Sequence, residues 1–301
     1  MNKLAKMMIR KVAGDLCNYK GNSPEEFEAW VRKVQKRAGS AEIPRKFRKR
    51  LNTEIVNTPY GSMYHVTAHS SPAPSDRAVF FIHGGGYVME ALKTHWDFCC
   101  RLAENTSCHI FFPLYKVLPE GNALAANEFL LDAYEQVLKD FPAEKIVLMG
   151  DSAGGNLAIH LTTNIIDSGL PLPKELILLS PGVSFTCLNE KEMEEVKRIS
   201  KEDIILGSFP VAKVHEAWRA GLPFEDKRSD VFKADVSSYP PVTIMIGTSD
   251  ILYKPAEKYA QKLLDSGVSC NFIKKEKGFH DYALSAKATD EFSYIVSKVS
   301  G

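Results

Sequence analysis

A serine between two glycines stands where an apolar run gives way to a helical pattern. The pentapeptide GDSAG, residues 150–154, follows the apolar residues 146–149 and precedes a helical pattern that begins at residue 155. A strand-to-helix turn of this kind is so tight that glycine is needed beside the serine, and the bend holds the serine hydroxyl clear of its own backbone. The motif predicts that Ser152 is a nucleophile.

A run of three glycines follows an earlier apolar segment. The sequence HGGGY, residues 83–87, comes directly after the strand-like residues 78–82. A glycine-rich strand exit that merely turns the chain is one interpretation. Acyl transfer, however, builds negative charge on a carbonyl oxygen, and preorganised backbone N–H groups stabilise that charge by about 3 kcal/mol per donor. Upstream of a nucleophilic serine, the segment predicts an oxyanion hole whose donors are the N–H groups of Gly84, Gly85, Gly86 and Ala153.

An acid and a base follow the serine, each on a loop after a strand-like run. Asp250 comes just after residues 242–247, and His280 follows the run at 269–273. We expect His280 to take the proton of Ser152 as a general base, while Asp250 orients the imidazole and stabilises the imidazolium. Four other acids could take the place of Asp250, although none directly follows so clear a strand: Asp203, Asp226, Asp230 and Asp235.

Together these segments resemble the hormone-sensitive-lipase group of α/β-hydrolases. The resemblance covers about residues 75 to 300 and rests on HGGG at 83–86, YKVLPE at 115–120, GDSAGGNLA at 150–158, Asp250 and His280. It implies an α/β-hydrolase fold, in which a mostly parallel central sheet carries helices on both faces and a helical cap covers the serine. It also implies a serine carboxylesterase or lipase.

Two departures from the usual pattern of this group are visible. Lys116 stands where the group usually has arginine, which puts a structural contact in doubt rather than the chemistry. Asp281 and Tyr282 follow the base, where the group commonly has glycine and phenylalanine. Asp281 could perturb the base or hydrogen-bond a substrate, but we expect it to face solvent.

Strand-like and helical patterns alternate along most of the chain. Strands are expected near residues 53–58, 62–68, 77–82, 108–114, 145–149, 175–180, 242–247 and 269–274. Helices are expected near residues 94–105, 123–140, 153–168, 254–267 and 284–299. Such alternation predicts an α/β fold with a mostly parallel sheet wrapped on both faces.

Two segments do not follow this alternation. Residues 1–50 are expected to be helical, with one helix carrying Leu4, Met7, Met8 and Val12 and a second running from a capping Ser23 to near Gly39. Residues 185–235 contain helical patterns but no convincing strand. We expect these two segments to form a cap over the catalytic core, which comprises residues 51–184 and 236–301.

Several side chains could shape a substrate pocket beside Ser152. Tyr87 and Asp151 border the serine and are expected to shape the site rather than to react. The cap segments also carry large apolar side chains that could line an acyl or alcohol pocket or could be ordinary cap core: Phe27, Trp30, Phe185, Met193, Phe209 and Trp218. The substrate-binding candidates are Tyr87, Asp151, Trp30, Phe209 and Trp218.

Composition and charge narrow the classes of partner. The 301 residues carry a net charge of +1, so nothing steers the whole chain toward nucleic acid. Residues 1–50 are basic, with 14 Lys and Arg against 5 Asp and Glu. Such a segment could bind nucleic acid or an anionic membrane, but we interpret it as a solvated helix face. No signal peptide or apolar run of roughly 20 residues is present, so stable membrane insertion is not expected.

The cysteines and histidines indicate neither a disulfide framework nor a metal site. Six cysteines show no CxxC pair and are predicted to be reduced thiols in a cytoplasmic protein. His65 and His69 would share one face of a strand about 13 Å apart, which is too far for one metal ion. Neither a metal nor a cofactor is expected.

The sequence thus predicts a cytoplasmic serine esterase that cleaves small-molecule esters of small to medium acyl chains through an acyl-enzyme. A homodimer is an expected assembly. A sugar O-deacetylase or a lactonase with the same triad remains an alternative, as does a non-catalytic small-molecule-binding protein on the same fold. The joint presence of Ser152, Asp250 and His280 argues against the binding protein.

Overall fold

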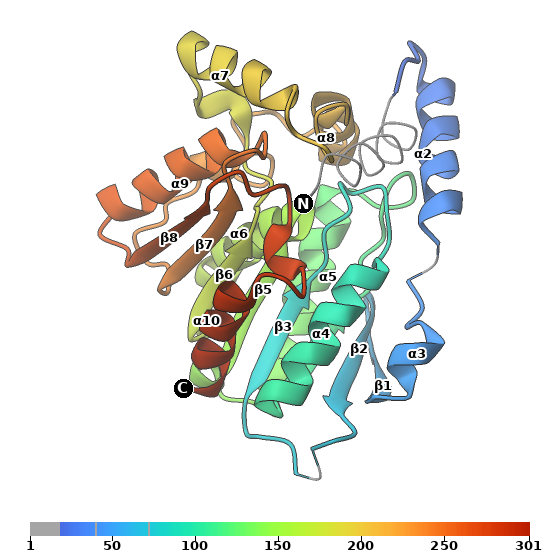
Figure 1. Ribbon diagram of the computed structural model, residues 1–301, viewed down its shortest axis with the longest axis vertical. Helices are drawn as coiled ribbons and strands as arrows, with labels where there is room; N and C mark the ends of the chain where they lie inside the picture. The colour runs from blue at the N-terminus through green and yellow to red at the C-terminus, as the bar shows by residue number, and fades with distance from the viewer. Residues whose placement is uncertain (1–18, 40, 72) are drawn as a thin grey trace.

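An eight-stranded sheet forms the centre of the computed structural model, which describes residues 19–39, 41–71 and 73–301 (Figure 1). The helix predicted around Leu4 and Val12 lies outside the described residues. The strands are β1 (Leu51–Thr58), β2 (Gly61–Ala68), β3 (Ala78–Ile82), β4 (His109–Pro113), β5 (Ile146–Asp151), β6 (Glu175–Leu179), β7 (Val242–Gly247) and β8 (Cys270–Lys275). Their order is β1-β2-β4-β3-β5-β6-β7-β8, and only the pairs β1–β2 and β2–β4 are antiparallel.

The central strands are buried on both faces, which explains their unbroken apolar sequences. Every residue of β3, β5, β6 and β7 is buried. Parallel strands need helical crossovers, and these helices cover both faces of the sheet, so no polar face is required. The edge strand β1 is exposed along most of its length, in keeping with its polar sequence.

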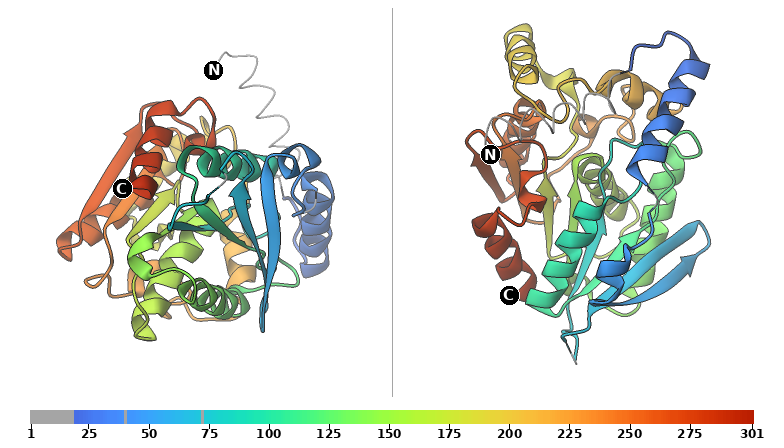
Figure 2. Two further views of the ribbon diagram at one scale, coloured as in Figure 1. Left: turned by 90° about the horizontal axis from the view of Figure 1, so that it is seen from below. Right: turned by 45° about the vertical axis from the view of Figure 1, so that its right-hand side comes forward.

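Helices cover the two faces in separate layers (Figure 2). On one face lie α3 (Arg45–Arg48), α4 (Lys93–Thr106) and α10 (Thr289–Ser300), whose buried side chains form one apolar cluster with the sheet. On the other lie α5 (Ala123–Leu138), α6 (Ser152–Asp167) and α9 (Tyr253–Asp265), which belong to a second cluster. The predicted α/β class, with a mostly parallel sheet wrapped on both faces, is confirmed.

The segment between β6 and β7 contains α7 (Glu190–Ser200) and α8 (Val211–Arg219), at the positions of the two helical patterns in the sequence. Both helices lie at the end of the sheet where the parallel strands finish, at the top of Figure 1. Short 3₁₀ turns flank them, and the described residues 185–235 contain no strand. Whether this segment and residues 1–50 divide the chain into the predicted cap and core stays a prediction.

Helix α2 (Pro24–Ala38) packs beside this segment. A capping box between Ser23 and Glu26, with proline at the first helical position, sets its start. Its apolar face is buried, and the ring of Trp30 lies 6.0 Å, centroid to centroid, from that of Phe209 in the α7–α8 connection. The side chain of Gln35 donates a hydrogen bond to the carbonyl of Leu118 at 2.7 Å. The helix is therefore docked at the end of the sheet where the parallel strands finish.

Two details of the helices differ from prediction. The last helix begins at Thr289 rather than near residue 284, because a 3₁₀ turn (Tyr282–Leu284) and an extended link precede it. The four-residue helix α3, which buries Phe47, was not predicted individually. Of the helices in the described residues, none combines the length and apolar character needed to cross a bilayer.

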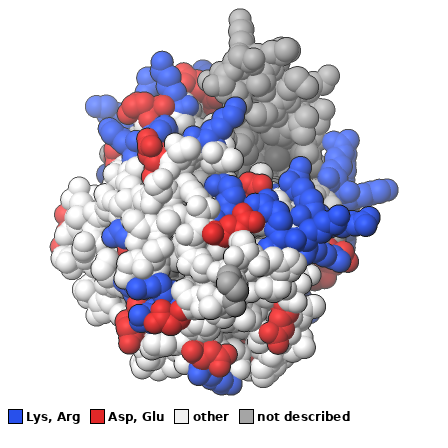
Figure 3. Space-filling model, turned by 60° about the horizontal axis from the view of Figure 1, so that its bottom comes forward, with Lys and Arg blue, Asp and Glu red and all other residues white. Residues whose placement is uncertain are grey.

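Exposed cations are dense between residues 32 and 50, and Figure 3 shows Lys and Arg gathered on one side of the molecular face that it presents. Part of this charge is neutralised locally. Arg32 pairs with Glu28 and Glu120, and Arg50 pairs with Glu104. The interpretation of residues 1–50 as a solvated helix face remains a prediction.

Candidate active site

Ser152 lies at the junction of β5 and α6 with its backbone in the left-handed region, at φ 50°. The glycines beside it are sterically required. A Cβ on Gly150 would stand 2.3 Å from the carbonyl oxygen of Gly154, and a Cβ on Gly154 would stand 2.1 Å from that of Ile82. This strained turn sets the hydroxyl at the first residue of α6, where the helix dipole favours developing negative charge.

Three side chains form one hydrogen-bonded chain that begins at this serine. Nε2 of His280 lies 2.8 Å from Oγ of Ser152, and Nδ1 of His280 lies 2.8 Å from Oδ2 of Asp250. The exposed fractions of the three residues are 7%, 3% and 0% in the order Ser152, His280, Asp250. Because a proton on Nδ1 is needed to donate to the carboxylate, Nε2 is left to accept the serine hydroxyl. General-base activation of a serine requires this arrangement.

The competing acids occupy other positions. Asp250 is held by the backbone N–H of Leu252, which donates to its second oxygen at 2.9 Å. Asp203 is buried nearby, but its Oδ2 accepts the N–H of Ile251 at 3.0 Å and so ties the α7–α8 connection to the loop after β7. In the described structure none of the other acids is hydrogen-bonded to His280; Asp226 binds Arg228, Asp230 binds Thr186 and Asp235 binds Ser237.

The triple-glycine loop offers a smaller set of donors than the sequence predicted. The N–H of Gly84 donates to Oδ1 of Asp151 at 3.0 Å, so the prediction that Gly84 contributes to an oxyanion hole is corrected. Gly85 and Gly86 have φ values of 118° and 60°, which glycine adopts readily. Among the hydrogen bonds of the described residues, none is donated by the N–H of Gly85, Gly86 or Ala153. Within the described part of the chain, these three donors have no competing acceptor.

Asp151 supports this loop and is fully buried. Its second oxygen accepts a hydrogen bond from Nε2 of His95 at 3.0 Å, while Nδ1 of His95 accepts the N–H of Leu92 at 2.8 Å. Burial raises the pKa of Asp151, but the interactions with His95 and Gly84 outweigh burial and hold the pKa below its ordinary value. Both oxygens are occupied, and the residue also lines a cavity that reaches Ser152, so contact between Asp151 and a substrate stays a prediction. His95 was missed because a histidine on an amphipathic helix carries no distinguishing signal.

A second tie to the loop comes from the YKVLPE segment. The hydroxyl of Tyr115 donates to the carbonyl oxygen of His83 at 2.8 Å, and the two rings stack with centroids 4.5 Å apart. Lys116, which replaces the usual arginine of the resembling group, is exposed. The side-chain contact between this segment and the triple-glycine loop therefore comes from the tyrosine, and the N–H of Leu118 adds a backbone bond to the carbonyl of Tyr87 at 2.8 Å.

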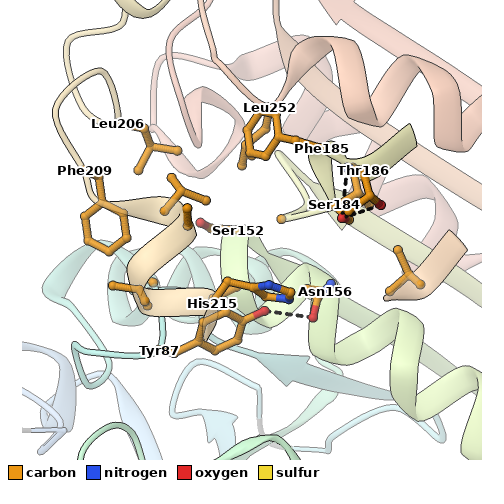
Figure 4. A pocket seen from close by; sticks show the side chains of 18 of the residues that line it. Tyr87, Ser152, Asn156, Ser184, Phe185, Thr186, Leu206, Phe209, His215 and Leu252 are labelled. Atoms are coloured by element: carbon orange, nitrogen blue, oxygen red, sulfur yellow. Dashed lines mark hydrogen bonds between the residues drawn. The ribbon is translucent and has the colours of Figure 1, made fainter. Parts of the chain in front are cut away.

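A cavity of about 290 Å³ opens beside Ser152, and we call it the apolar cavity (Figure 4). Much of its wall comes from the segment between β6 and β7 and is formed by Phe185, Leu206, Phe209, Val211, Val214 and Val231. The hydroxyl of Tyr87 donates to Oδ1 of Asn156 at 2.8 Å, so these two polar groups of the wall satisfy each other. The wall also contains Ser184, Thr186, His215 and Ser229, but most of its exposed surface is apolar. A hydrocarbon chain fits such a surface.

A second cavity, of about 580 Å³, also reaches Ser152, and we call it the histidine-side cavity. Gly86, Leu206 and Phe209 border both cavities. Only the second is lined by His280 and Asp281, and its wall carries the polar side chains Lys46, Lys93, Thr94, Asp97 and Ser285. The serine therefore stands between two cavities, and of these only the histidine-side cavity is lined by lysine and aspartate side chains.

The predicted pocket residues divide into cavity walls and packing behind them. Tyr87, Phe185 and Phe209 line the apolar cavity. The prediction that Trp30 and Trp218 bind substrate is wrong, because neither lines a cavity that reaches Ser152. Trp218 stacks on Tyr87 with ring centroids 4.5 Å apart. Trp30 packs against Phe209 with ring centroids 6.0 Å apart. Phe27 and Met193 are likewise absent from both walls.

Asp281 was expected to face solvent, and this expectation is wrong. Its side chain is 20% exposed, and Oδ2 lies 3.1 Å from Nε2 of His280.

Within the described residues, no group of three His, Cys, Asp or Glu side chains is placed to hold a metal ion.

Comparisons with known proteins agree with this geometry. Residues 79–284 match a family model described as the alpha/beta hydrolase fold. An acetyl-hydrolase of Streptomyces hygroscopicus is 26% identical over 219 residues, which is 72% of each chain. An ethyl acetate hydrolase of Pseudomonas putida is 23% identical over 229 residues, or 73% of this chain and 70% of that one. The crystal structure of a hormone-sensitive lipase from a metagenome library superposes with a TM-score of 0.80 at 21% identity, covering 100% of this chain and 98% of that one.

The resemblance predicted from the motifs is thereby confirmed. By the extent of its match to the family model, together with its sheet order and its glycine-flanked serine, the chain belongs to the α/β-hydrolase fold family.

Proposed function

We propose that the protein is a serine carboxylesterase that hydrolyses its substrate through an acyl-enzyme on Ser152. The observation that carries this proposal is the buried chain from Ser152 through His280 to Asp250, with both links at 2.8 Å. Three backbone N–H groups beside the serine, which have no acceptor among the described residues, also support it. So do relatives that are named as an acetyl-hydrolase and an ethyl acetate hydrolase.

In the first step Oγ of Ser152 bonds to the ester carbonyl carbon as its proton moves to Nε2 of His280. The π electron pair of the carbonyl moves onto the oxygen, and the N–H groups of Gly85, Gly86 and Ala153 stabilise that oxyanion. Each such donor contributes about 3 kcal/mol to the stability of the transition state. Asp250 accepts the hydrogen bond from Nδ1–H throughout and stabilises the imidazolium without taking its proton.

The position of His280 assigns the two cavities. When the tetrahedral intermediate collapses, the carbon–oxygen bond to the alcohol breaks and the leaving oxygen takes the proton from Nε2. The alcohol must therefore lie on the side of the serine where His280 stands, which is the histidine-side cavity. The acyl chain then occupies the apolar cavity. Water enters from the alcohol side and repeats the same steps in the opposite direction.

The size of the apolar cavity supports small to medium acyl chains. Its volume is about 290 Å³, and Leu206 and Phe209 lie at its border with the second cavity. Long chains would have to displace these side chains or leave the cavity. The histidine-side cavity is larger and carries charged side chains such as Lys93 and Asp97, which suits an alcohol with hydrogen-bonding groups and keeps a sugar O-deacetylase within the same proposal.

A cytoplasmic location and a homodimer remain predictions from the sequence. In support of a reducing compartment, the described cysteines are free thiols: Cys99, Cys100, Cys108, Cys187 and Cys270. The division into a core and a two-part cap is proposed on the docking of α2 beside Phe209 and on the cavity wall that residues 185–235 supply.

The test is hydrolysis of p-nitrophenyl esters, from acetate upward in chain length, by the wild type and by Ser152→Ala, His280→Ala and the double variant. We expect wild-type turnover with a preference for short to medium chains. Each single variant should retain less than a few per cent of the rate, and the double variant should be no worse, since nucleophile and base act as a unit. A wild type that binds esters without hydrolysing them would instead be a binding protein, and the proposal would fail.

A further inference from the structure

The imidazole of His280 stands between two carboxylates, one at each ring nitrogen. Asp250 faces Nδ1 at 2.8 Å, as the proposed reaction requires. Asp281 faces Nε2 at 3.1 Å, and this is the same nitrogen that lies 2.8 Å from Oγ of Ser152. The reaction described above gives Asp281 no task, although it contacts the atom that carries the transferred proton.

The backbone holds Asp281 in this position. Its φ of 56° is in the left-handed region, which aspartate tolerates better than most residues. Its N–H donates to Oγ of Ser180 at 3.0 Å, which anchors the turn to the end of β6. The second carboxylate oxygen, Oδ1, is buried and has no hydrogen-bond partner among the described residues. The ion pairs found for the described residues connect Asp281 with His280 and with no lysine or arginine.

The effect of this contact depends on the proton. When His280 is neutral and protonated on Nδ1, Nε2 and the carboxylate are both acceptors, so the contact contributes no hydrogen bond. When His280 is an imidazolium, its Nε2–H can donate to Oδ2 of Asp281 in a charge-assisted hydrogen bond. The carboxylate therefore stabilises the protonated form of the base relative to the neutral form.

The surroundings act in the same direction. Burial lowers the pKa of His280, but the charges of Asp281 and Asp250 outweigh burial and raise that pKa well above its ordinary value. Burial raises the pKa of Asp281 to about 6, so the two groups titrate as a pair.

The other charged and titratable groups around this pair come from several elements. Asp151 at the end of β5, His95 on α4 and Asp203 in the α7–α8 connection act on it through space. Lys93 and Lys46 line the same cavity. Among the described ion pairs of His280, the partners are Asp250 and Asp281 alone. Asp151 and Asp203 are occupied by His95 and by backbone N–H groups.

We propose that Asp281 is a positioning residue that holds the imidazolium of His280 at its serine-facing nitrogen, and that it thereby sets the pH at which the esterase becomes active. The inference rests on the proposed function. During acylation the proton passes from Ser152 to Nε2 and then to the leaving oxygen, and Asp281 supports the positive charge between these transfers without keeping the proton. In the free enzyme the same contact raises the pKa of His280, so the base is still protonated, and the enzyme inactive, at a higher pH than without Asp281. A faster reaction at alkaline pH and an earlier loss of activity on acidification are two consequences of one contact.

The test compares pH profiles of kcat and kcat/KM for wild type, Asp281→Asn and Asp281→Gly. Asparagine and glycine both tolerate the left-handed backbone, so the turn should survive, and thermal melting would check the fold. Glu276→Gln is the matched control, because it removes one carboxylate from the same loop at an exposed position that lines neither cavity beside Ser152. We expect both Asp281 variants to shift the acidic limb of kcat/KM down by about one pH unit and to lower the alkaline plateau of kcat about tenfold. Glu276→Gln should change neither the acidic limb of kcat/KM nor the alkaline plateau of kcat.

A purely structural role for Asp281 would lower the rate at every pH and leave the limb in place, and that result would overturn the proposal. Titration of the His280 imidazole by NMR, in protein with labelled histidine, gives a second reading that needs no turnover. Its pKa should fall by about one unit in Asp281→Asn. If no ester were hydrolysed, the proposed function would fail, while an unchanged imidazole pKa would overturn the role of Asp281 independently.

Discussion

The ring of Phe209 lies directly against Gly86. A Cβ on this glycine would stand 2.5 Å from the tip of the ring, so a side chain from the segment between β6 and β7 closes over the proposed oxyanion hole. Phe209 also borders both cavities beside Ser152. One aromatic ring thus contacts one of the three donor residues, Gly86, and borders both the proposed acyl space and the proposed alcohol space.

Replacing Phe209 with alanine should widen the acyl space and weaken discrimination by chain length. We expect kcat/KM for medium-chain p-nitrophenyl esters to rise relative to the acetate, with a change of about tenfold in the ratio, since one methylene in an apolar pocket is worth 1–3 kcal/mol. Val231→Ala, at the wall of the apolar cavity but not of the second cavity, is the matched comparison. An unchanged chain-length profile in Phe209→Ala would remove this residue from the acyl site.

Asp250→Asn should preserve the fold but cut kcat by a factor on the order of 10⁴, because the amide favours the wrong imidazole tautomer. Steady-state kinetics at the pH optimum would measure the loss. Asp203→Asn is the informative comparison, since Asp203 is a buried neighbour that binds backbone N–H groups rather than the imidazole. Severe catalytic damage from Asp203→Asn with a nearly silent Asp250→Asn would show that the acid has been misassigned.

Trp30→Ala should destabilise the protein and loosen the wall that Phe209 forms. The indole is 8% exposed and packs on Tyr19, Phe27 and Phe209. We expect a loss of about 3 kcal/mol in the free energy of unfolding and a raised KM with little change in the reactivity of Ser152 toward a phosphonate. Lys33→Ala, on the exposed face of the same helix, should do neither. Normal KM values in a folded Trp30→Ala protein would count against a cap role for α2.

His160 should make the protein less stable in acid. Burial lowers its pKa to about 4, whereas an unfolded histidine titrates near 6.5. Between these values the unfolded chain binds a proton that the folded chain does not, so stability falls as pH decreases from about 6.5 to about 4. In His160→Asn the slope of unfolding free energy against pH should be smaller by up to about 1.4 kcal/mol per pH unit in this window. Denaturant unfolding at a series of pH values would measure this slope. If the curves of unfolding free energy against pH were parallel for the wild type and His160→Asn, the lowered pKa of His160 would be contradicted.

Much of the architecture could be predicted because the sequence patterns are local. Apolar runs marked the buried strands, and the helical spacing at 211–220 marked α8. The order of Ser152, Asp250 and His280 followed from loops that end parallel strands at one edge of the sheet. The boundary of the last helix was missed because the 3₁₀ turn at Tyr282–Leu284 has the same apolar composition as a helix start.

What could not be predicted depends on contacts between distant segments. The N–H of Gly84 is occupied by Asp151, 67 residues away, and no motif encodes such a pairing. Trp30 and Trp218 pack against other aromatic rings rather than lining the cavities. The sequence pattern of an aromatic side chain on a helix face is the same whether its partner is a ligand or another ring. Asp281 was expected at the surface, but a left-handed backbone folds its carboxylate back onto the preceding histidine.

The central claim, an acyl-enzyme on Ser152, can be tested by mass spectrometry of protein quenched in acid during turnover of an ester and after treatment with a fluorophosphonate. The account predicts a single acyl or phosphonyl adduct on the peptide that contains Ser152, absent in Ser152→Ala. Ester turnover that persists in Ser152→Ala, or an adduct mapped to another residue, would contradict it.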